Sequence, residues 1–563
     1  MHNISEVTTD VLVIGGGAAG GLAALEAQKK TDDVMIAVKG LGGKSGNTPM
    51  AEGGVQATFH LKDSIEEHVK DTLKAGKYIN DPLLVKTLAQ KAPSLLKVIE
   101  EYGVSFKKND NGDYFQFATS GSSYPRCLWI NGGGASLARN IFDHVKKSNI
   151  VMIEDIMITK LLVSGGHIAG AVGLDYKNGK IVVIRAKAVV IATGGNERLY
   201  YFSDGSVDST GDGNALAFEA GVELINMEFI QFYPHALVWP EALKGTIITE
   251  EVYYDNLIGA RLLNGQFEEF THKYDPVNKE KTTRDILARA ILTEIEEGRG
   301  SEHGGVIINV TGCNKKDVLY LIGPLYNYLK KNGVDILKSP LEVAPSAHYQ
   351  CGGIRIDKDG GTNIKGLYAA GECCGGFDGA NRLSSNALTE AVVFGIIAGA
   401  NAGLYASRSQ IGPVEKDQIK KAINEIMSIV NNQTKKGLDV LNVKNQLQRL
   451  MTQKVGLIRH KEGLEEALSL LMEIRDIEFG RINLSDKSLV CNLELIQALE
   501  LKSLIENAIL VTSSALFRCE SRGSHYRVDF PKENNEVWRK HTLITKTNNS
   551  SHIQSLEIEM DMR

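Results

Sequence analysis

The chain has 563 residues, of which 43% are hydrophobic and 23% charged, and its formal net charge is -5. A chain of this length is expected to form roughly three or four domains with buried cores, and its composition is that of an ordinary globular protein. Because the net charge is negative and the basic residues form no block, nucleic acid is not expected as a partner.

The N-terminal segment is polar. Met1 to Asp10 lacks the charged-then-apolar order of a signal peptide. Elsewhere, no apolar run approaches the ~20 residues of a membrane span. We therefore expect a cytoplasmic protein that does not itself cross a membrane and that reaches one only through partner subunits.

A strand, a glycine-rich turn and a helix come next. An apolar strand ending at Ile14 leads through the pattern G-x-G-x-x-G, formed by Gly15, Gly17 and Gly20, into a helix of small residues. Gly15 permits the tight turn, Gly17 lets a pyrophosphate approach the backbone, and Gly20 lets the helix pack on the strand. The free N–H groups and the dipole of the helix start bind phosphates. This segment predicts a dinucleotide site, with NAD and FAD both open at this point.

The second strand argues against a simple NAD site. Val34 to Val38 ends at Lys39 and Gly40 and lacks the acidic residue that usually binds the ribose of NAD. Downstream, Ser64 to Tyr102 has the helical period of apolar residues.

Two further junctions repeat the strand-then-glycine form of the first. Lys187 to Ala192 is a short apolar strand followed by Thr193-Gly194-Gly195, and Gly366 to Glu372 has the same arrangement ahead of a small-residue helix over Asn386 to Tyr405. Pieces of a nucleotide-binding fold therefore recur at the start, in the middle and near the end of the first 411 residues.

The segment from Glu228 to Ala347, between the second and third of these pieces, has a different composition, rich in aromatic, proline and charged residues. We interpret it as an inserted domain. After Gly412-Pro413 the chain is poor in glycine and shows amphipathic helices, and beyond Thr545 it is polar and expected to be poorly ordered or partner-bound. We expect an α/β protein with a Rossmann-like domain over 1–230 and 350–411, an α+β capping domain over 231–349, a helical domain over 412–525 and a C-terminal tail over 526–563.

Seven cysteines are scattered along the chain without a C-x-x-C pair or a four-ligand cluster, so neither an iron-sulfur cluster nor a metal site is expected within the chain. The adjacent Cys373 and Cys374 have two interpretations, a redox pair or two buried small side chains, and the second is favoured because glycines surround them.

Taken together, these segments resemble the flavoprotein subunit of succinate dehydrogenase and fumarate reductase, a family that also includes L-aspartate oxidase. The resemblance covers roughly Asp10 to Thr542. Beyond the first glycine pattern, it is carried by motifs that occur in the family's order: Ala51–Ala57, Ala192–Gly195, Thr210–Gly213, Glu228–Phe232, Thr249–Glu250, Arg284–Asp285, Ala288–Arg289, His348–Gly353, Gly379–Leu383 and Glu520–Gly523.

The resemblance implies bound FAD, a capping domain that closes over the flavin, and an iron-sulfur partner subunit that exchanges electrons with it. The segment from Trp538 to Leu543 is similar to the end of succinate dehydrogenase and fumarate reductase chains and less similar to aspartate oxidase. The cofactor positions that the resemblance implies are Gly15, Gly17, Ala18, Ala19, Gly20, Lys39, Asn47, Thr48, Gly53, Gly54, Thr193, Gly194, Asp212, Glu372, Arg382, Ser385, Ala387 and Leu388.

The family reaction exchanges a hydride between the flavin and the double-bond carbon of a dicarboxylate, and it needs cations to hold carboxylates and stabilise developing charge. By resemblance, Arg382 and His348 bind a carboxylate and Thr249 supplies a hydroxyl contact. Arg284 matches the proposed proton donor, with Glu250 in its relay. Since a guanidinium is normally never deprotonated, Arg284 has a second interpretation, in which it pairs with Glu250 and only supplies positive charge.

Four positions depart from the family pattern. The histidine that links FAD covalently in some members is replaced by Asn47, which predicts noncovalent FAD and favours reduction over succinate oxidation. Tyr233 replaces a histidine, with His235 two residues further on able to share its face of an extended strand. Tyr253 replaces a relay arginine, and Asp378 replaces a histidine and brings an anion that would oppose a substrate carboxylate.

These departures leave alternatives open. The favoured function is that of a fumarate-reductase-like flavoprotein subunit with a small carboxylate as substrate. The alternatives are an oxidase of the L-aspartate type, a flavin reductase of another unsaturated acid, and a flavin-binding subunit that has lost its substrate site, which the retained polar groups argue against.

Overall fold

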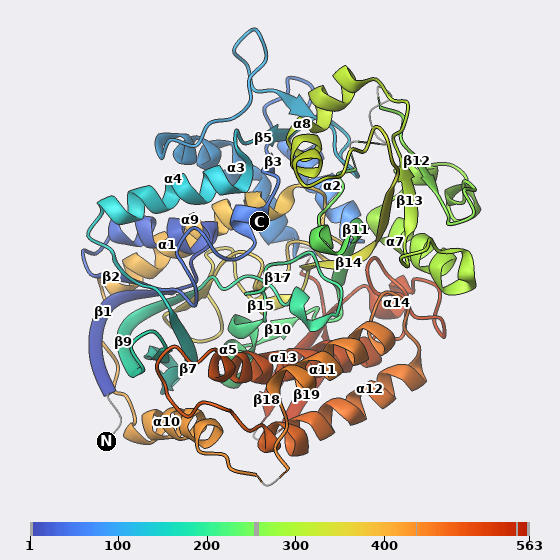
Figure 1. The fold of residues 1–563 in the computed structure, drawn as a ribbon. Helices are drawn as coiled ribbons and strands as arrows, with labels where there is room; N and C mark the ends of the chain where they lie inside the picture. The colour runs from blue at the N-terminus through green and yellow to red at the C-terminus, as the bar shows by residue number, and fades with distance from the viewer. Residues whose placement is uncertain (1–3, 251, 253–257, 435, 548–549, 560–563) are drawn as a thin grey trace.

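The structure is a computed structural model, and it describes residues 4–250, 252, 258–434, 436–547 and 550–559. Its largest sheet is built around the first strand, with the order β6-β2-β1-β9-β8-β7 and with β16 beside β9 (Figure 1). The strands β1, β2, β6, β9 and β16 are mutually parallel where they pair, whereas β7 and β8 are antiparallel to their neighbours. The strand bounds are β1 Ile4–Ile14, β2 Val34–Ala37, β6 Val151–Ile153, β7 Ile156–Ser164, β8 His167–Asp175, β9 Lys180–Ile191 and β16 Leu367–Ala369.

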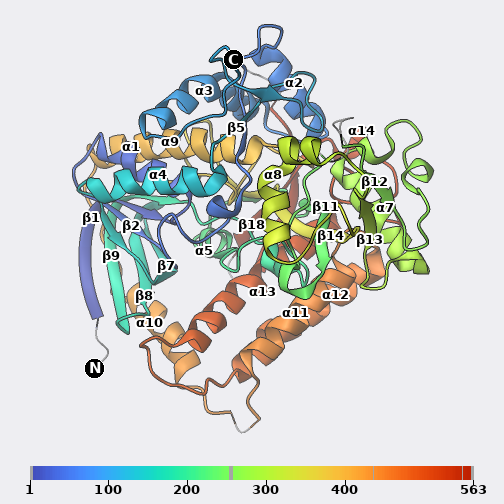
Figure 2. The same ribbon diagram turned by 45° about the horizontal axis from the view of Figure 1, so that its top comes forward.

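Two parallel helices, α1 (Ala18–Gln28) and α9 (Asn386–Ala406), lie against each other beside this sheet (Figure 2). They cross at small residues, because Gly395, Gly399 and Gly403 of α9 face the backbone of Ala19, Ala23 and Ala27 of α1. A Cβ atom at Gly399 would lie 2.2 Å from the carbonyl oxygen of Ala23. The crossing therefore fixes the spacing of the two helix starts.

Among the described residues, α9 is the one helix that is long and apolar enough to cross a membrane by length and composition. The sequence predicted this helix but not that it is long and apolar enough to span a membrane, because Glu390 and several small polar residues interrupt its apolar run. Of its most apolar window, 67% is buried inside the protein. That burial is typical of a core helix, and here it arises from packing on α1 and the sheet.

Further elements before the cap pack around α1 and α9. They are β3 (Gly54–Gln56), β4 (Gln116–Phe117), β5 (Cys127–Trp129), α2 (Ile65–Ala75), α3 (Pro82–Glu101) and α4 (Gly133–Lys147). Ser64 caps α2 and Asp81 caps α3, each through its side chain. The helical period predicted over 64–102 thus falls into two helices divided by Gly76 and the Asp81-Pro82 start signal.

A second hydrophobic core lies in the capping unit, which occupies the upper right of Figure 1. Its antiparallel sheet has the order β11-β14-β13-β12, and the chain enters along β11 and leaves along β14. These elements are β11 Ile230–Trp239, β12 Arg261–Leu263, α7 Arg284–Glu294, β13 Val306–Asn309, α8 Lys315–Lys331 and β14 Leu341–Gln350.

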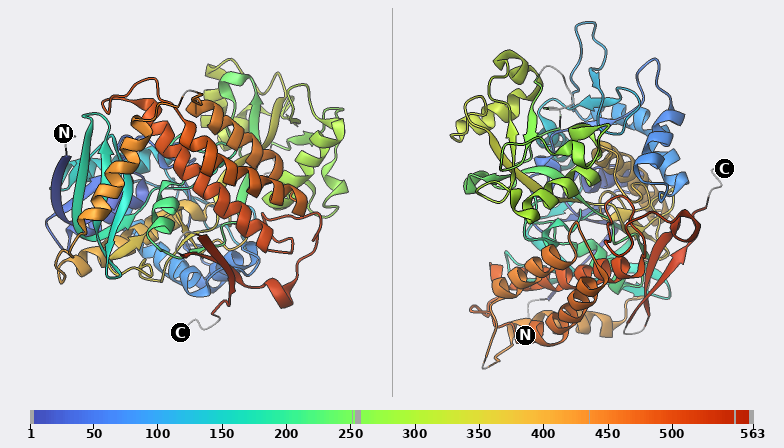
Figure 3. Two further views of the ribbon diagram at one scale, coloured as in Figure 1. Left: turned by 90° about the horizontal axis from the view of Figure 1, so that it is seen from below. Right: turned by 90° about the vertical axis from the view of Figure 1, so that its right-hand side faces the viewer.

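Long helices pack below the sheets, and Figure 3 shows them in front when the molecule is seen from below. The helix α13 (Leu493–Phe517) is buried along most of its length, since α11, α12 and the short helix α5 (Asp212–Glu219) pack on it. The others are α10 Lys416–Val430, α11 Val440–Lys454 and α12 Lys461–Glu473. The architecture confirms the α/β class expected from the sequence.

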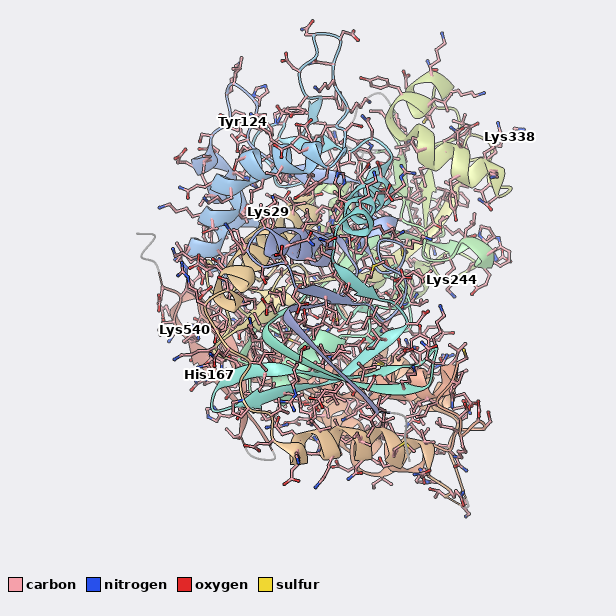
Figure 4. All side chains as sticks on the ribbon, turned by 90° about the vertical axis from the view of Figure 1, so that its left-hand side faces the viewer. Lys29, Tyr124, His167, Lys244, Lys338 and Lys540 are labelled. Carbon is pink, nitrogen blue, oxygen red and sulfur yellow. The ribbon has the colours of Figure 1, made fainter. Side chains whose placement is uncertain are left out.

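The C-terminal segment corrects the sequence analysis. The expected poorly ordered tail beyond Thr545 instead forms a hairpin, β18 (His541–Thr547) and β19 (Ser550–Leu556), at the edge of the sheet β17-β15-β10-β18-β19. The sheet forms because Leu543 and Ile544 are buried against β10. Figure 4 shows Lys540, next to this hairpin, on the side of the molecule opposite Lys244 and Lys338. The other strands of this sheet are β10 Leu224–Ile225, β15 Gly353–Arg355 and β17 Cys374–Gly375.

The helix crossing generates the first prediction. Gly399→Ala is expected to lower the free energy of unfolding by about 1–3 kcal/mol, because the added methyl overpacks the α1–α9 contact, and to weaken retention of the cofactor. Gly323→Ala in α8 is the matched control, since its Cβ would meet no atom within 4 Å. Urea unfolding of both variants tests this, and equal stability of the two variants would contradict the account.

Candidate active site

The predicted dinucleotide turn is compact in the structure. Gly15 has φ +125°, and a Cβ atom there would lie 2.1 Å from the carbonyl oxygen of Ala192. A Cβ atom at Gly20 would lie equally close to the carbonyl oxygen of Gly15. Within the described residues, no side chain caps Gly17 and the first turn of α1 holds no acidic group. The helix start therefore presents N–H groups and a positive dipole end to a phosphate.

Neighbouring segments complete this cradle. Thr48 accepts a hydrogen bond from the N–H of Ala18 at 3.1 Å. Thr193 Oγ1 is buried without a hydrogen-bond partner among the described residues, and Gly194 beside it has φ +78°. A buried, unsatisfied hydroxyl near this helix start is what a polar cofactor would satisfy. These residues fit a bound dinucleotide.

Lys39 and Asp212, both assigned to the cofactor from the sequence, bind each other. Lys39 Nζ lies 2.8 Å from Asp212 and 2.8 Å from Glu500. Burial by itself lowers the pKa of Lys39, but the two carboxylates overcome this and raise it above its ordinary value. The pair fastens the end of β2 to α5 and α13.

Asn47 is held by protein groups rather than left open. Its amide donates to Glu372 Oε2 at 3.2 Å, and its carbonyl accepts from the N–H of Ser206 at 2.8 Å and from Ser209 Oγ at 3.1 Å. Burial and the nearby Glu197 carboxylate raise the pKa of Glu372 well above its ordinary value.

The other predicted cofactor positions lie at the start of α9. A Cβ atom at Gly54 would come within 2.8 Å of Ser385 Oγ, and Ser385 itself begins α9 with φ +64°. Gly53 has φ +105° and approaches the backbone of Gly133. Ala387 and Leu388 belong to the first turn of α9. A second helix start thus lies beside the segment that follows Thr48.

Arg382 is the centre of the predicted substrate site. It is 6% exposed, and its Nη2 donates to His348 Nε2 at 2.9 Å and to Gln231 Oε1 at 3.2 Å. Its guanidinium lies 4.2 Å from the ring centroid of Tyr349. Nε of Arg382 is buried without a hydrogen-bond partner in the described part of the chain. A fixed guanidinium with an unsatisfied donor is suited to a carboxylate.

His348 lies at a bulge in β14. The ladder pairs Gln231 with Tyr349 and Phe232 with Ala347, which leaves His348 as the extra residue. Bulges turn side chains out of the regular alternation and are common beside active sites. Since Arg382 donates to Nε2, the ring donates from Nδ1 to Asp204 Oδ1 at 2.9 Å.

Arg284 and Glu250 form a second contacting pair. Arg284 begins α7, and its Nε donates to Glu250 Oε1 at 2.7 Å while its Nη2 donates to Ser384 Oγ at 3.1 Å. Thr249, next to Glu250, is 7% exposed. The ring of Tyr233 joins this pair to Arg382 and His348, with its centroid 4.8 Å from the Arg284 guanidinium and 5.0 Å from the His348 ring.

The structure also places the departures from the family pattern. His235 is fully buried edge-on to Tyr233, and a second bulge follows Tyr233, so simple alternation does not apply there. Burial, with Arg284 nearby, lowers the pKa of His235 to about 3, so its ring is neutral. Tyr253 lies outside the described residues.

Sequence reasoning missed several residues that position this site. Gln231, Asp204 and Ser384 hold Arg382, His348 and Arg284 respectively. Gln231 lies two residues before Tyr233, within the motif that ends at Phe232, and that spacing was a usable signal. Asp204 and Ser384 left no such signal, because their roles depend on contacts between distant segments.

Comparisons with known proteins agree with this geometry. The family described as FAD binding domain matches residues 10–388, and the one described as fumarate reductase flavoprotein C-term matches 444–562. A fumarate reductase (CoM/CoB) subunit from Methanothermobacter marburgensis is 39% identical, over 95% of this chain and 97% of its own length. The succinate dehydrogenase flavoprotein subunit of Rickettsia felis is 31% identical, over 96% and 94%.

Solved structures give the same result. A mutant of the E. coli quinol fumarate reductase FrdA superposes with a TM-score of 0.93 at 28% identity, covering 100% of this chain and 98% of that one. Mycobacterium smegmatis Sdh1 in complex with UQ1 superposes with a TM-score of 0.89 at 32% identity, covering 100% and 96%. The chain belongs to the family of FAD-dependent flavoprotein subunits of fumarate reductases and succinate dehydrogenases.

Proposed function

We propose that this chain is the catalytic flavoprotein subunit of a fumarate reductase, which reduces the carbon–carbon double bond of a C4 dicarboxylate. The observation that carries the proposal is Arg382, which has an unsatisfied Nε and contacts His348 through Nη2. Ser384, two residues after it, accepts a hydrogen bond from Arg284. Two cations from two different domains can thus act on one small dianion, which is the arrangement that charge development on a carboxylate requires.

FAD is proposed to bind noncovalently, along the helix starts at Gly17 and Ser385. When bound, it supplies the hydride. Arg382 and His348 hold one carboxylate of the substrate, and Thr249 contacts it from the side of the Arg284–Glu250 pair. Tyr233 is only 3% exposed, and its ring excludes water from the space between the two arginines. The low dielectric that results strengthens each charge contact.

The proton is proposed to come from Arg284. Its guanidinium is directed by Glu250 and Ser384, and a proton delivered to the substrate carbon is returned through the Glu250 contact. Reduction of fumarate to succinate then consumes one hydride and one proton, which balances the two electrons and two protons of the reaction.

Electrons are proposed to arrive from an iron-sulfur partner subunit, at the cytoplasmic side of any membrane involved. The relative from Methanothermobacter is named as one subunit of a fumarate reductase, which supports the reductive direction and a complex of several chains. Co-purification of the chain from its own cells with an iron-sulfur protein would support the partner.

The reaction can be tested anaerobically. After chemical reduction of the FAD-loaded protein, fumarate is expected to restore the oxidised flavin spectrum within one turnover. Arg284→Lys should slow this step by about 10²–10³-fold with little change in fumarate affinity, because lysine keeps the charge but lacks the guanidinium that contacts both Glu250 and Ser384 and is positioned to deliver the proton in the transition state. Arg289→Lys, on the same helix but in contact with Gly523 and Tyr526, is the control and should react normally. A wild-type flavin that stays reduced with fumarate would overturn the proposed function.

Noncovalent attachment has a separate test. Acid precipitation of the holoprotein is expected to leave all of the flavin in the supernatant, because the Asn47 side chain is an amide already engaged with Glu372 and Ser206. Flavin fluorescence that stays with the precipitated chain would contradict this.

A further inference from the structure

A second group of buried ionisable side chains lies next to Arg382, beyond the residues proposed to hold substrate. Asp378 is 2% exposed and precedes Arg382 in a tight loop. Gly379 within that loop has φ +59°, and its Cβ would lie 2.5 Å from the carbonyl oxygen of Gly76, so the loop cannot swing outward. The carboxyl group of Asp378 is therefore held inside the protein.

Asp378 has an acidic neighbour on α9. Glu390 is fully buried and interacts directly with Asp378. Tyr349 Oη donates to Glu390 Oε1, and Arg382 lies over the ring of the same tyrosine at 4.2 Å. One tyrosine thus contacts both the acid pair and the cation that binds substrate.

We propose that Asp378, supported by Glu390 and Tyr349, is a positioning residue that couples the binding of a dicarboxylate at Arg382 to the uptake of one proton. This inference rests on the proposed function, since it deepens the description of the same substrate site. With Glu390 protonated, an ionised Asp378 cancels the positive charge of Arg382. A dianionic substrate can bind well only when a proton neutralises Asp378 and leaves that positive charge available.

Charged and titratable groups from several elements surround the acid pair, and one of them is Cys374 of β17, whose pKa is raised by burial and by the nearby Glu390. Arg382 is the cation in the loop, and Tyr349 and Cys351 come from β14 and the residue after it. Burial raises the pKa of both Tyr349 and Cys351 well above the ordinary values, so both are neutral. His348, held by Asp204, contacts the other edge of Arg382.

The titration behaviour supports the geometry. Burial raises the pKa of Asp378 to about 7, although Arg382 acts to lower it. Burial and the charge of Asp378 raise the pKa of Glu390 well above its ordinary value. The pair therefore exchanges one proton near neutral pH, with Glu390 protonated throughout.

The sign of the coupling follows from charge. Carboxylates bound at Arg382 disfavour the ionised form of Asp378, so the complex holds more protons than the free protein. Affinity is greatest below the pKa of Asp378 and falls by up to tenfold per pH unit above it.

The test uses the oxidised, FAD-loaded protein with succinate as the probe, followed by the change in flavin absorbance and by an indicator dye in weak buffer. We expect proton uptake approaching one per succinate bound at pH 8, and an affinity that decreases from pH 6 to pH 9. Asp378→Asn should abolish both effects. Glu390→Gln should keep both, because its amide still donates toward Asp378. Glu506→Gln on α13 removes another carboxyl whose pKa burial raises, and it should change nothing.

The outcomes separate the two proposals. Uptake that persists in Asp378→Asn, or a pH-independent affinity in the wild type, overturns this inference while leaving fumarate reduction intact. If no dicarboxylate perturbs the flavin at any pH, the proposed function fails and the inference fails with it. If Asp378→Asn does not retain FAD, Asp378→Glu serves instead and should shift the midpoint of the affinity profile, and an unshifted midpoint overturns the coupling.

Discussion

The pairing of β11 with β14 is the constraint on which the site depends. The chain enters the capping unit along one strand and leaves it along the other, so both connections to the FAD-binding domain pass through a single two-stranded ladder. Gln231 and Tyr233 lie on the first strand, and His348 and Tyr349 lie on the second. Because the two strands are hydrogen-bonded where they meet the cofactor domain, all four side chains reach Arg382 and Arg284 in a fixed arrangement.

The helix crossing has the same role on the cofactor side. Small residues on α1 and α9 set how far apart the two helix starts lie, and the first glycine pattern sets where α1 begins. Ser384 and Arg382 lie just before α9, so the position of this helix also determines where the guanidinium proposed to bind substrate lies. Cofactor and substrate positions are thereby linked through one rigid contact, and a change at the crossing should affect both.

The sequence predicted the parts of this site that follow from local pattern. Gly15, Gly17 and Gly20 indicated a phosphate site, because the backbone conformation that requires glycine there is set by neighbouring residues in the sequence. The resemblance indicated Arg382, His348, Arg284 and Glu250, and the structure brings these residues together in two contacting pairs joined by Tyr233.

Features that depend on distant contacts could not be predicted. To predict the bulge at His348, one must know how two strands pair that are more than a hundred residues apart in the sequence. The hydrogen bond between His348 and Asp204 and the proximity of Glu390 to Asp378 also depend on contacts between segments that are distant in the sequence. The C-terminal hairpin was missed because its polar outer residues hide a buried strand, which forms only once β10 is present.

The central claim is that Arg382 and Arg284 act together on one dicarboxylate. The most direct measurement is an experimental structure of the oxidised, FAD-loaded protein with malonate, which resists reduction. The account predicts one carboxylate on Nε of Arg382, close to His348, with the ligand extending past Tyr233 toward Arg284. Malonate bound elsewhere, or Arg284 turned away from the ligand with its Glu250 contact broken, would contradict it.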